Sequence, residues 1–271
     1  MKRILYILTI SIIALVGCNG SNKASDVTSN AAQQSDKQDV VQVAFATSKV
    51  DTSVANDNGI KCQITVNLHY AKGGAVADAI NAAVLNCGLF PKECAGGSKA
   101  TDMPNRANDI AKHYVKSFLE NDLDLPYDNP QLFFDVYSKM FFGRDSIICY
   151  EYGYDSFMGG VRNNYQMVSL NFDLKTGKLI KLKDFIKPEA EGKIAELIVA
   201  DVIKQFDDCT SLQDLQDNHL IFSEFDPYVP ENFVIGKDFV EFIYQHEEIA
   251  PYAVGFVTAK IPYKDLEGCL R

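Results

Sequence analysis

The chain has 271 residues, a formal net charge of −10 at pH 7, and 47% hydrophobic residues. An acidic chain of this kind is repelled by nucleic acid and by anionic lipid surfaces, which excludes both as expected partners. The negative charge suits a cationic partner, although simple solubility would explain it equally well.

The N-terminus has the pattern of a bacterial lipoprotein signal. Lys2 and Arg3 precede an apolar run over residues 4–16, which is shorter than the roughly 20 residues of a membrane-spanning helix. Gly17 and then Cys18 close the run, so we expect cleavage after residue 17 and acylation of Cys18. The alternative is an ordinary signal peptide in which Cys18 is incidental. Loss of residues 1–17 removes two positive charges and leaves a formal charge of −12.

These features predict a lipid-anchored location in the cell envelope, with the bilayer as partner through palmitate-like acyl chains on Cys18. Asn19 follows the cysteine, where an aspartate would be the usual inner-membrane retention signal in enteric bacteria. Its absence favours the outer membrane, or another periplasmic face, in a Gram-negative cell. Residues 18–59 are rich in Ser, Asn, Asp and Gln, and we interpret them as a disordered tether. Within this range, the short apolar patch at residues 40–45 either docks on the following domain or forms a stray strand.

From residue 60 the pattern becomes globular, and residues 60–130 are predicted as a smaller N-terminal α+β part. Ile64, Val66, Leu68 and Tyr70 alternate with polar residues, which predicts a half-buried strand. Apolar residues at helical spacing follow over 80–87. A longer helix is predicted from Asp102 to near residue 123.

Residues 131–271 are predicted as a C-terminal α+β domain, which together with residues 60–130 could form either one domain or two intimately packed halves. Strands are expected over 131–142, 144–154 and 168–174, followed by a turn at 175–178 and a strand at 179–182. Pro188 opens a second long helix, and closing strands are expected over 233–235, 239–244 and 254–261. Strands in adjacent pairs with few helices indicate an α+β fold, with a largely antiparallel sheet and two longer helices packed on it.

Six cysteines remain once Cys18 is assigned to lipid, and an even number in an oxidising compartment predicts up to three disulfides. Cys87 and Cys94 are close in sequence and are expected to pair. The remaining pairs, assigned by remainder, are Cys209 with Cys269 and Cys62 with Cys149. A zinc site is disfavoured because no pair has C-x-x-C spacing and no histidine lies near a cysteine pair. No metal and no cofactor are expected.

Recognisable catalytic machinery is absent from the sequence. There is no G-x-S-x-G elbow, H-E-x-x-H helix or Walker loop, and the four histidines are scattered. Carboxylates are plentiful, but a paired-carboxylate hydrolase needs two of them held close together in a cleft. We therefore expect a protein that is not an enzyme.

Two loops have residue types that are common at binding interfaces. Residues 150–165 combine tyrosines, paired glycines, an arginine and asparagines, and residues 247–255 contain a tyrosine in a turn shaped by Pro251 and Gly255. The alternative for both loops is that the rings pack into the core. The candidate ligand-binding residues are Tyr152, Tyr154, Gly159, Gly160, Arg162, Asn163, Tyr165 and Tyr252.

The same segments carry a family resemblance. Residues 152–160, 168–178 and 182–185, together with 248–255 and 261–266, resemble the RsiV/PdaC-type extracellular domain family. Residues near Cys62 and 79–81 are similar to the smaller domain that usually precedes it. The resemblance implies an extracytoplasmic receptor, because the domain in the anti-sigma factor RsiV binds lysozyme. In PdaC the domain accompanies a separate deacetylase domain.

The chain departs from the family at one place. Members often have Gly-Gly-Ala-His-Pro after the tyrosine-rich strand, whereas Gly159 and Gly160 are followed here by Val161, Arg162 and Asn163. The leading hypothesis is a non-enzymatic envelope module that binds or senses a lysozyme-like cationic hydrolase or cell-wall fragments. The alternatives are a cell-wall hydrolase with an unrecognised carboxylate site, and a structural envelope protein without a specific ligand.

Overall fold

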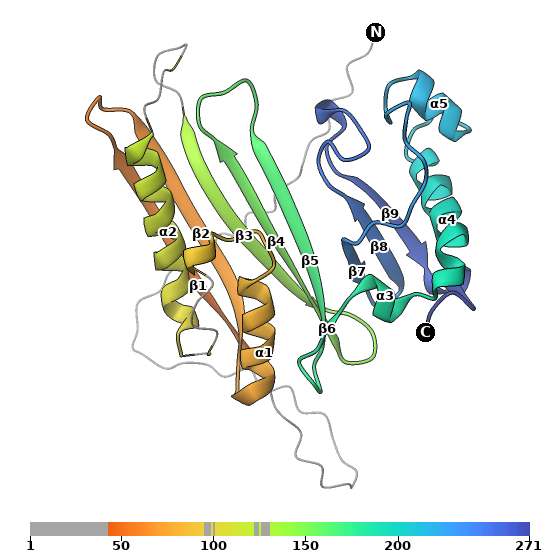
Figure 1. Cartoon of the computed structure of the whole chain (residues 1–271), viewed down its shortest axis with the longest axis horizontal. Coiled ribbons are helices and arrows are strands. Elements are labelled where there is room, and N and C mark those ends of the chain that lie inside the picture. The colour runs from red at the N-terminus through yellow and green to blue at the C-terminus, as the bar shows by residue number, and fades with distance from the viewer. Residues whose placement is uncertain (1–42, 95–98, 100, 122–124, 126–130) are drawn as a thin grey trace, which may run out of the picture. The chain divides into compact units, whose positions relative to one another are not determined.

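The computed structural model describes residues 43–94, 99, 101–121, 125 and 131–271. In this part of the chain the strands form two sheets, not the single sheet expected from the sequence (Figure 1). The larger sheet is antiparallel except where β2 and β3 run parallel, which confirms the predicted α+β class with a largely antiparallel sheet. Its strands, in spatial and chain order, are β1 (Ala44–Ala55), β2 (Lys61–Lys72), β3 (Leu132–Phe142), β4 (Ile147–Phe157), β5 (Asn164–Asp173) and β6 (Leu179–Ile180).

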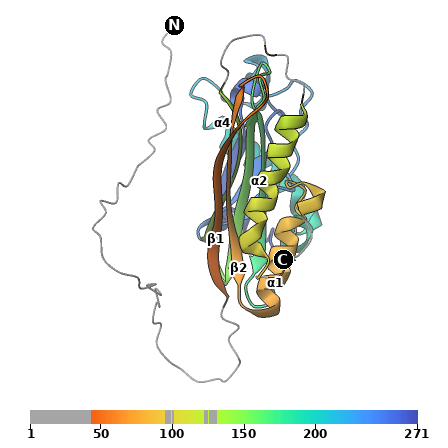
Figure 2. The same cartoon turned by 90° about the vertical axis from the view of Figure 1, so that its left-hand side faces the viewer.

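One face of the six-stranded sheet is apolar and is covered by helices. Alternate residues of a strand point to the same face, and on β2 this set is Ile64, Val66 and Leu68, all 0% exposed. Helix α1 (Gly74–Leu85) packs on β2, and α2 (Met103–Glu120) packs on β1 and β2. Both helices lie on the same side of the sheet (Figure 2). On the opposite face, Cys149 of β4 belongs to a second core, which includes the buried residues of the smaller sheet.

The smaller sheet contains β7 (Phe233–Ile235), β8 (Phe239–Tyr244) and β9 (Val257–Pro262), all antiparallel. Helix α4 (Glu191–Ile203) packs on β9, so the two longer helices cover different sheets. Helix α5 (Leu212–Asp217) lies between α4 and β7. Its start is a capping box, in which Ser211 Oγ accepts from the Asp214 amide at 3.1 Å and Asp214 Oδ2 accepts from the Ser211 amide at 2.9 Å.

Side-chain carboxamides join the two sheets where no strand pairing does. We call Asn171, Asn232 and Gln245 the amide seam. Asn171 Nδ2 donates to the carbonyl of Phe233 at 2.8 Å, and its Oδ1 accepts from the amide of Ile235 at 2.8 Å. Asn232 and Gln245 bind the outward backbone groups of β5. A carboxamide offers one donor and one acceptor in the manner of a peptide group, so the seam replaces a backbone ladder.

The predicted tether extends too far into the chain. Residues 44–55 fall within its expected range of 18–59, yet they form β1, which pairs with β2 along its whole length. The strand was not predicted because many of its residues are polar and exposed. Phe45, Val50 and Val54 nevertheless pack against the core. The expected signal peptide, Cys18 and the start of the tether lie outside the described residues.

The predicted boundary at residue 130 is also wrong. Strand β2 precedes it and β3 follows it, but the two pair in parallel within one sheet. Local periodicity cannot reveal a pairing between strands so distant in sequence. The change of core comes later, after β6, where α3 (Leu182–Phe185) leads into the second sheet.

The expected disulfides are not present, because all six cysteines of the described part are free thiols. Cys62 lies in the helix-covered core and Cys149 in the other core, so they are on opposite faces of the sheet with β3 between their strands. The Cys149 Sγ instead donates to Asn171 Oδ1 at 3.0 Å, and burial raises the pKa of this thiol to about 12. The pairs Cys87 with Cys94 and Cys209 with Cys269 are likewise unbridged.

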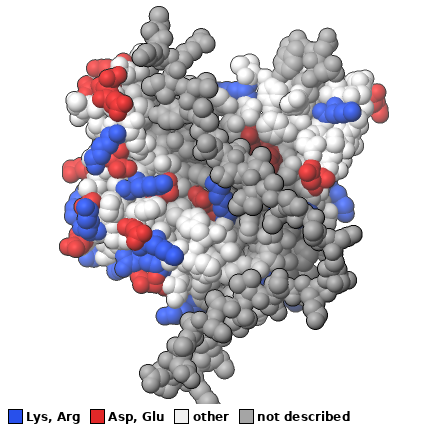
Figure 3. Space-filling view, turned by 180° about the vertical axis from the view of Figure 1, so that it is seen from behind, with Lys and Arg blue, Asp and Glu red and all other residues white. Residues whose placement is uncertain are grey.

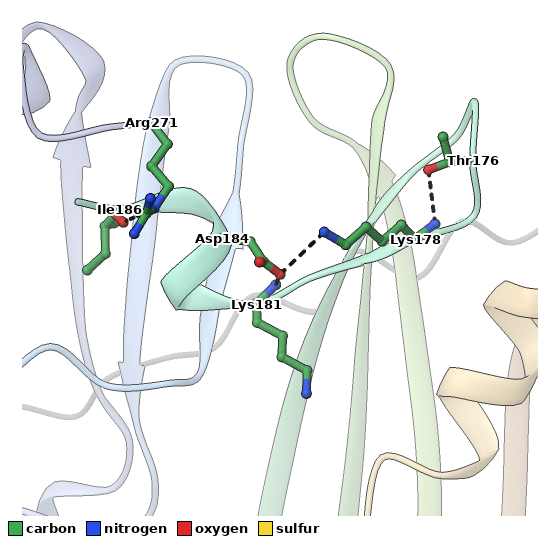
Figure 4. A network of polar contacts seen from close by, with 6 residues as sticks. All are labelled: Thr176, Lys178, Lys181, Asp184, Ile186 and Arg271. Carbon is green, nitrogen blue, oxygen red and sulfur yellow. Dashed lines mark hydrogen bonds and ion pairs between the residues drawn. The ribbon is translucent and has the colours of Figure 1, made fainter. Parts of the chain in front are cut away.

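The connection between the sheets is fixed by polar contacts around α3 (Figure 4). Lys178 Nζ lies 3.8 Å from Asp184 Oδ2, which also accepts from the Lys181 amide at 3.4 Å. The C-terminus folds back beside this segment, where Arg271 Nε donates to the Ile186 carbonyl at 2.9 Å. Arg271 is therefore bonded to the segment that leads from α3 into the second sheet.

A tight approach between the sheets gives the first testable prediction. A Cβ on Gly143 would overlap the Ile235 carbonyl oxygen, so we expect Gly143→Ala to destabilise the protein by about 1–3 kcal/mol. Gly192, in α4, has nothing within 4 Å of its ideal Cβ, and Gly192→Ala is expected to be neutral or stabilising by up to about 1 kcal/mol. Urea unfolding compares the two, and equal stabilities would contradict the close packing.

Candidate functional site

The two loops singled out in the sequence meet in space. The turn between β4 and β5 carries Arg162, and the loop between β8 and β9 carries Glu247 and Tyr252. Arg162 Nη1 lies 2.7 Å from Glu247 Oε1, and the Arg162 guanidinium carbon lies 4.9 Å from the centre of the Tyr252 ring. One arginine therefore links the six-stranded sheet to the smaller one at their common edge.

His246 is the aromatic centre of this contact. Its ring centroid lies 4.4 Å from that of Tyr252 in an edge-to-face arrangement and 5.4 Å from that of Tyr165. Phe256 lies edge-on to His246 as well, with ring centroids 5.7 Å apart. We call Arg162, Asn163, Tyr165, His246, Glu247 and Tyr252 the rim cluster.

A partly buried carboxylate supports the rim cluster from β4. Asn163 Nδ2 donates to Asp155 Oδ1 at 3.2 Å and also contacts the Tyr165 hydroxyl at 3.1 Å. Burial raises the pKa of Asp155, while hydrogen bonds from Asn163 and Tyr165 act in the opposite direction. The three residues orient one another, and this fixes the Tyr165 ring against His246.

The loop between β8 and β9 carries backbone conformations that few residues adopt. Glu247 has a φ of +62°, which is uncommon for a residue with a side chain, and Gly255 has φ +82° and ψ −148°, a region open almost only to glycine. Such strain often marks functional segments, and here it places the Glu247 carboxylate against Arg162. The side chains of Arg162 and Glu247 remain 51% and 42% exposed.

A surface hollow of about 440 Å³ opens beside the rim cluster along the edge of β5. This size is within the usual range for small-ligand sites. Its walls are strand β5 on one side and the start of the loop between β8 and β9 on the other. The lining residues are Asn163, Asn164, Tyr165, Gln166, Met167, Val168, Gln245, His246 and Glu247.

The structure separates the eight predicted ligand-binding residues into three groups. Arg162, Asn163, Tyr165 and Tyr252 belong to the rim cluster, whereas Tyr152 is 0% exposed and belongs to the helix-covered core. The expectation that Tyr152 contacts a ligand is therefore corrected.

The other three predicted residues shape the surroundings of the cluster. Tyr154 stacks on Tyr114, with ring centroids 5.6 Å apart, on the helix-covered face. Gly159, at φ +88°, allows the turn to approach Leu125, and Gly160 follows it in the same turn. No local sequence pattern indicates Asp155 or His246, because their role depends on the contact between the two loops.

Two carboxylates also face each other on the open side of the sheet. Asp135 of β3 and Asp155 of β4 are directly opposite partners, and such pairs have Cβ atoms about 4.5–5.5 Å apart. Burial raises the pKa of both, and the charge of Asp155 raises that of Asp135 further. Among the described residues, no group of three or more His, Cys, Asp or Glu side chains is placed to hold a metal ion.

This pair gives a prediction for pH dependence. The folded protein raises the pKa of Asp135, so its proton is held where the unfolded chain has lost it. The resulting stability falls as pH rises from about 3.9 through the raised pKa. We expect Asp135→Asn to be more stable than the parent at pH 7, by less than about 1 kcal/mol because water screens the pair. The gain should vanish below about pH 3.5 in urea unfolding; a variant less stable at pH 7 would contradict the prediction.

The protein therefore belongs to the α+β class, and its two sheets meet at an edge formed by the polar and aromatic residues of the rim cluster. Residues 183–264 match the sequence model of a family described as a protein of unknown function, DUF3298, so the chain carries a DUF3298 domain. This domain spans α3 to β9 and includes the Glu247 and Tyr252 half of the rim cluster. No curated protein matches the sequence.

Two solved structures share the fold. A DUF3298 family member from Bacteroides fragilis is 22% identical, has a TM-score of 0.72, and covers 86% of this chain and 96% of its own. A DUF3298 family protein from Pseudomonas aeruginosa is 17% identical, has a TM-score of 0.56, and covers 84% of this chain and 95% of its own. Both matches include the larger sheet as well as the DUF3298 domain. None of the helices in the described residues is long and apolar enough to cross a bilayer.

Proposed function

We propose that this protein is a cell-envelope lipoprotein, anchored through Cys18, that acts as a non-enzymatic binding or sensing module. The rim cluster is its binding surface. The observation that carries the proposal is the meeting of two loops from different sheets, which presents tyrosine and arginine at an exposed edge. These are the residue types that most often anchor interfaces.

The candidate partners are a lysozyme-like cationic protein or a cell-wall fragment. The acidic chain, at −10, would attract a cationic protein. Seen from behind, basic and acidic side chains are interspersed over the part that carries the smaller sheet (Figure 3). Because the charges on this face are mixed, a partner would be recognised by the side chains of the rim cluster and not by a broad patch of one charge.

The test is a titration with a lysozyme and with solubilised peptidoglycan fragments, using a matched pair of arginine variants. Arg144 repeats the chemistry of Arg162 elsewhere in the fold: its Nε lies 2.7 Å from Asp145 Oδ2, and its guanidinium carbon lies 4.1 Å from the Tyr263 ring centre. We expect Arg162→Ala to weaken binding at least tenfold, about 1.4 kcal/mol, and Arg144→Ala to leave it unchanged. No binding of either probe, or equal losses in both variants, would contradict the proposal.

The opposed carboxylates favour a second candidate, a cell-wall hydrolase. Asp135 and Asp155 have raised pKa values, as the acid of a carboxylate pair requires. Such an enzyme would release reducing ends from peptidoglycan, and Asp155→Asn would abolish the release while Glu247→Gln would retain it. Absence of release by the parent protein would leave the binding module as the supported function.

A further inference from the structure

The side of the six-stranded sheet opposite α1 and α2 gathers carboxylates on β3 and β4. Tyr152 of β4 points into the helix-covered core, so the residues that alternate with it point to the opposite side, which we call the open side. Directly opposite residues of neighbouring strands share a side. Three such pairs follow one another on the open side, namely Asp135 with Asp155, Tyr137 with Gly153, and Lys139 with Glu151.

Tyr137 lies across the glycine at the centre of these pairs. A Cβ on Gly153 would be 2.0 Å from Tyr137 Cζ and 2.3 Å from its hydroxyl oxygen, so the end of the ring covers Gly153. Burial raises the pKa of Tyr137, and the negative charges of Asp155, Asp135 and Glu151 raise it further. The hydroxyl therefore lies among the three carboxylates. We call Asp135, Tyr137, Glu151 and Asp155 the carboxylate patch.

The carboxylate patch is not neutralised by an ion pair. Within the described residues, none of its three carboxylates is in contact with a lysine or arginine nitrogen. Burial raises the pKa of Glu151, and the nearby charge of Lys139 only partly offsets this rise. Lys260 of the smaller sheet lies 3.7 Å from Glu241 instead. All four residues of the patch are half-buried, so a ligand can still reach their negative charge.

Two oxygen atoms beside the patch are buried without a hydrogen-bond partner. Ser169, which is 8% exposed, is the direct partner of Glu151 on β5 and so points to the open side next to it. Asn67 follows Val66 of the helix-covered core and so points to the open side as well. In the described part of the chain, Ser169 Oγ and Asn67 Oδ1 make no hydrogen bond, which is costly for buried polar atoms. Both observations indicate a ligand that donates hydrogen bonds.

From this arrangement we infer that the carboxylate patch binds an alkylammonium group, as carried by a lysine side chain or a free diamine. An ammonium has three donors and no acceptor, which matches the carboxylates and the unpaired oxygen atoms. The Tyr137 ring would add cation–π attraction. The inference goes beyond the proposed function, since it assigns a second site on the open side. Only Asp155 belongs both to this patch and to the support of the rim cluster.

The test titrates the full chain with two probes, 1,5-diaminopentane and a tri-lysine peptide blocked at both ends, at up to about 10 mM in calorimetry. We expect both probes to bind, and Glu151→Gln and Asp135→Asn each to weaken binding at least about fivefold. Because Asp135→Asn should be more stable than the parent at pH 7, its weaker binding could not result from unfolding. Lys139→Gln removes the competing cation and should strengthen binding about twofold or more.

The matched control is Glu120→Gln, which removes the same charge from α2, on the other side of the sheet (Figure 2). It should leave the affinity unchanged. Acetylation of the three lysine Nζ atoms should abolish binding of the peptide, and about 500 mM salt should weaken binding of both probes relative to about 50 mM. Tighter binding of the diamine identifies a free diamine as the ligand, and tighter binding of the peptide identifies a lysine-rich protein; both support the inference.

Three outcomes would overturn the inference. One is that neither probe binds at about 10 mM. Another is that Glu120→Gln weakens binding as much as Glu151→Gln does, since the effect would then be one of net charge. The third is that Ca²⁺ displaces both probes at equal concentration, which would identify a metal site. In each case, binding of a lysozyme that remains sensitive to Arg162→Ala would leave the proposed function standing.

Discussion

Asn171→Leu is expected to destabilise the protein by about 3–5 kcal/mol. Asn171 is 1% exposed, and its carboxamide satisfies the buried Ile235 amide and Phe233 carbonyl of β7. Leucine fills similar space but leaves both backbone groups without a partner, and each such group costs about 1–3 kcal/mol. Urea unfolding measures the loss. Asn164→Leu, at the exposed start of the same strand, is the control and should change stability by less than about 0.5 kcal/mol.

A second substitution separates hydrogen bonding from packing at this position. Asn171→Asp keeps an acceptor for the Ile235 amide but, when ionised, cannot donate to the Phe233 carbonyl. Burial would raise the pKa of the new carboxyl, so the folded chain would bind a proton before the unfolded chain does. The defect should therefore shrink as pH falls toward about 4. A loss below about 1 kcal/mol for Asn171→Leu, or a pH-independent defect for Asn171→Asp, would show that the seam does not join the sheets.

Tyr152→Ala should cost about 3–5 kcal/mol of stability, because it removes a fully buried ring. The Tyr152 ring stacks on Tyr150 at 5.8 Å and meets Phe90 edge-on at 5.6 Å, and its hydroxyl donates to the His69 carbonyl at 2.6 Å. Tyr152→Phe keeps the ring and should cost only about 0.5–1.5 kcal/mol. Thermal or urea unfolding of the three proteins gives the comparison.

Tyr165→Ala is the matched control for Tyr152→Ala, since Tyr165 comes from the next strand but is only half-buried in the rim cluster. It should lower stability by less than about 1.5 kcal/mol while weakening ligand binding at least tenfold. The opposite pattern, a stable Tyr152→Ala protein that cannot bind, would return Tyr152 to the ligand site and contradict its assignment to the core.

Several parts of this fold follow from local sequence patterns. The alternation at Ile64, Val66 and Leu68 predicts β2, and the apolar stripe after Pro104 predicts α2, because both signals lie within a single element. Strand β1 was missed because its exposed face is polar and its stability comes from pairing with β2. Division into two sheets was missed because Asn171, Asn232 and Gln245 look like ordinary polar residues until β5 and β7 are side by side.

The candidate site was predictable only in halves. Arg162 and Tyr252 could be selected by residue type, but not their contact, which depends on how the second sheet packs against β5. Tyr152 and Tyr165 have the same side chain and lie on neighbouring strands. Tyr152 is nevertheless buried in the core, whereas Tyr165 belongs to the rim cluster. Their roles differ because they point to opposite faces of the sheet. The alternation of a tyrosine-rich segment does not say which face is covered.

Hydrogen exchange with and without a bound lysozyme or peptidoglycan fragment tests the central claim most directly. In the proposed function, one surface built from two loops of different sheets binds the partner. We predict joint protection of peptides covering residues 158–166 and 245–256, with no change at the 143–146 turn that carries Arg144. Protection of only one of the two loops, or protection confined to another part of the chain, would contradict the claim.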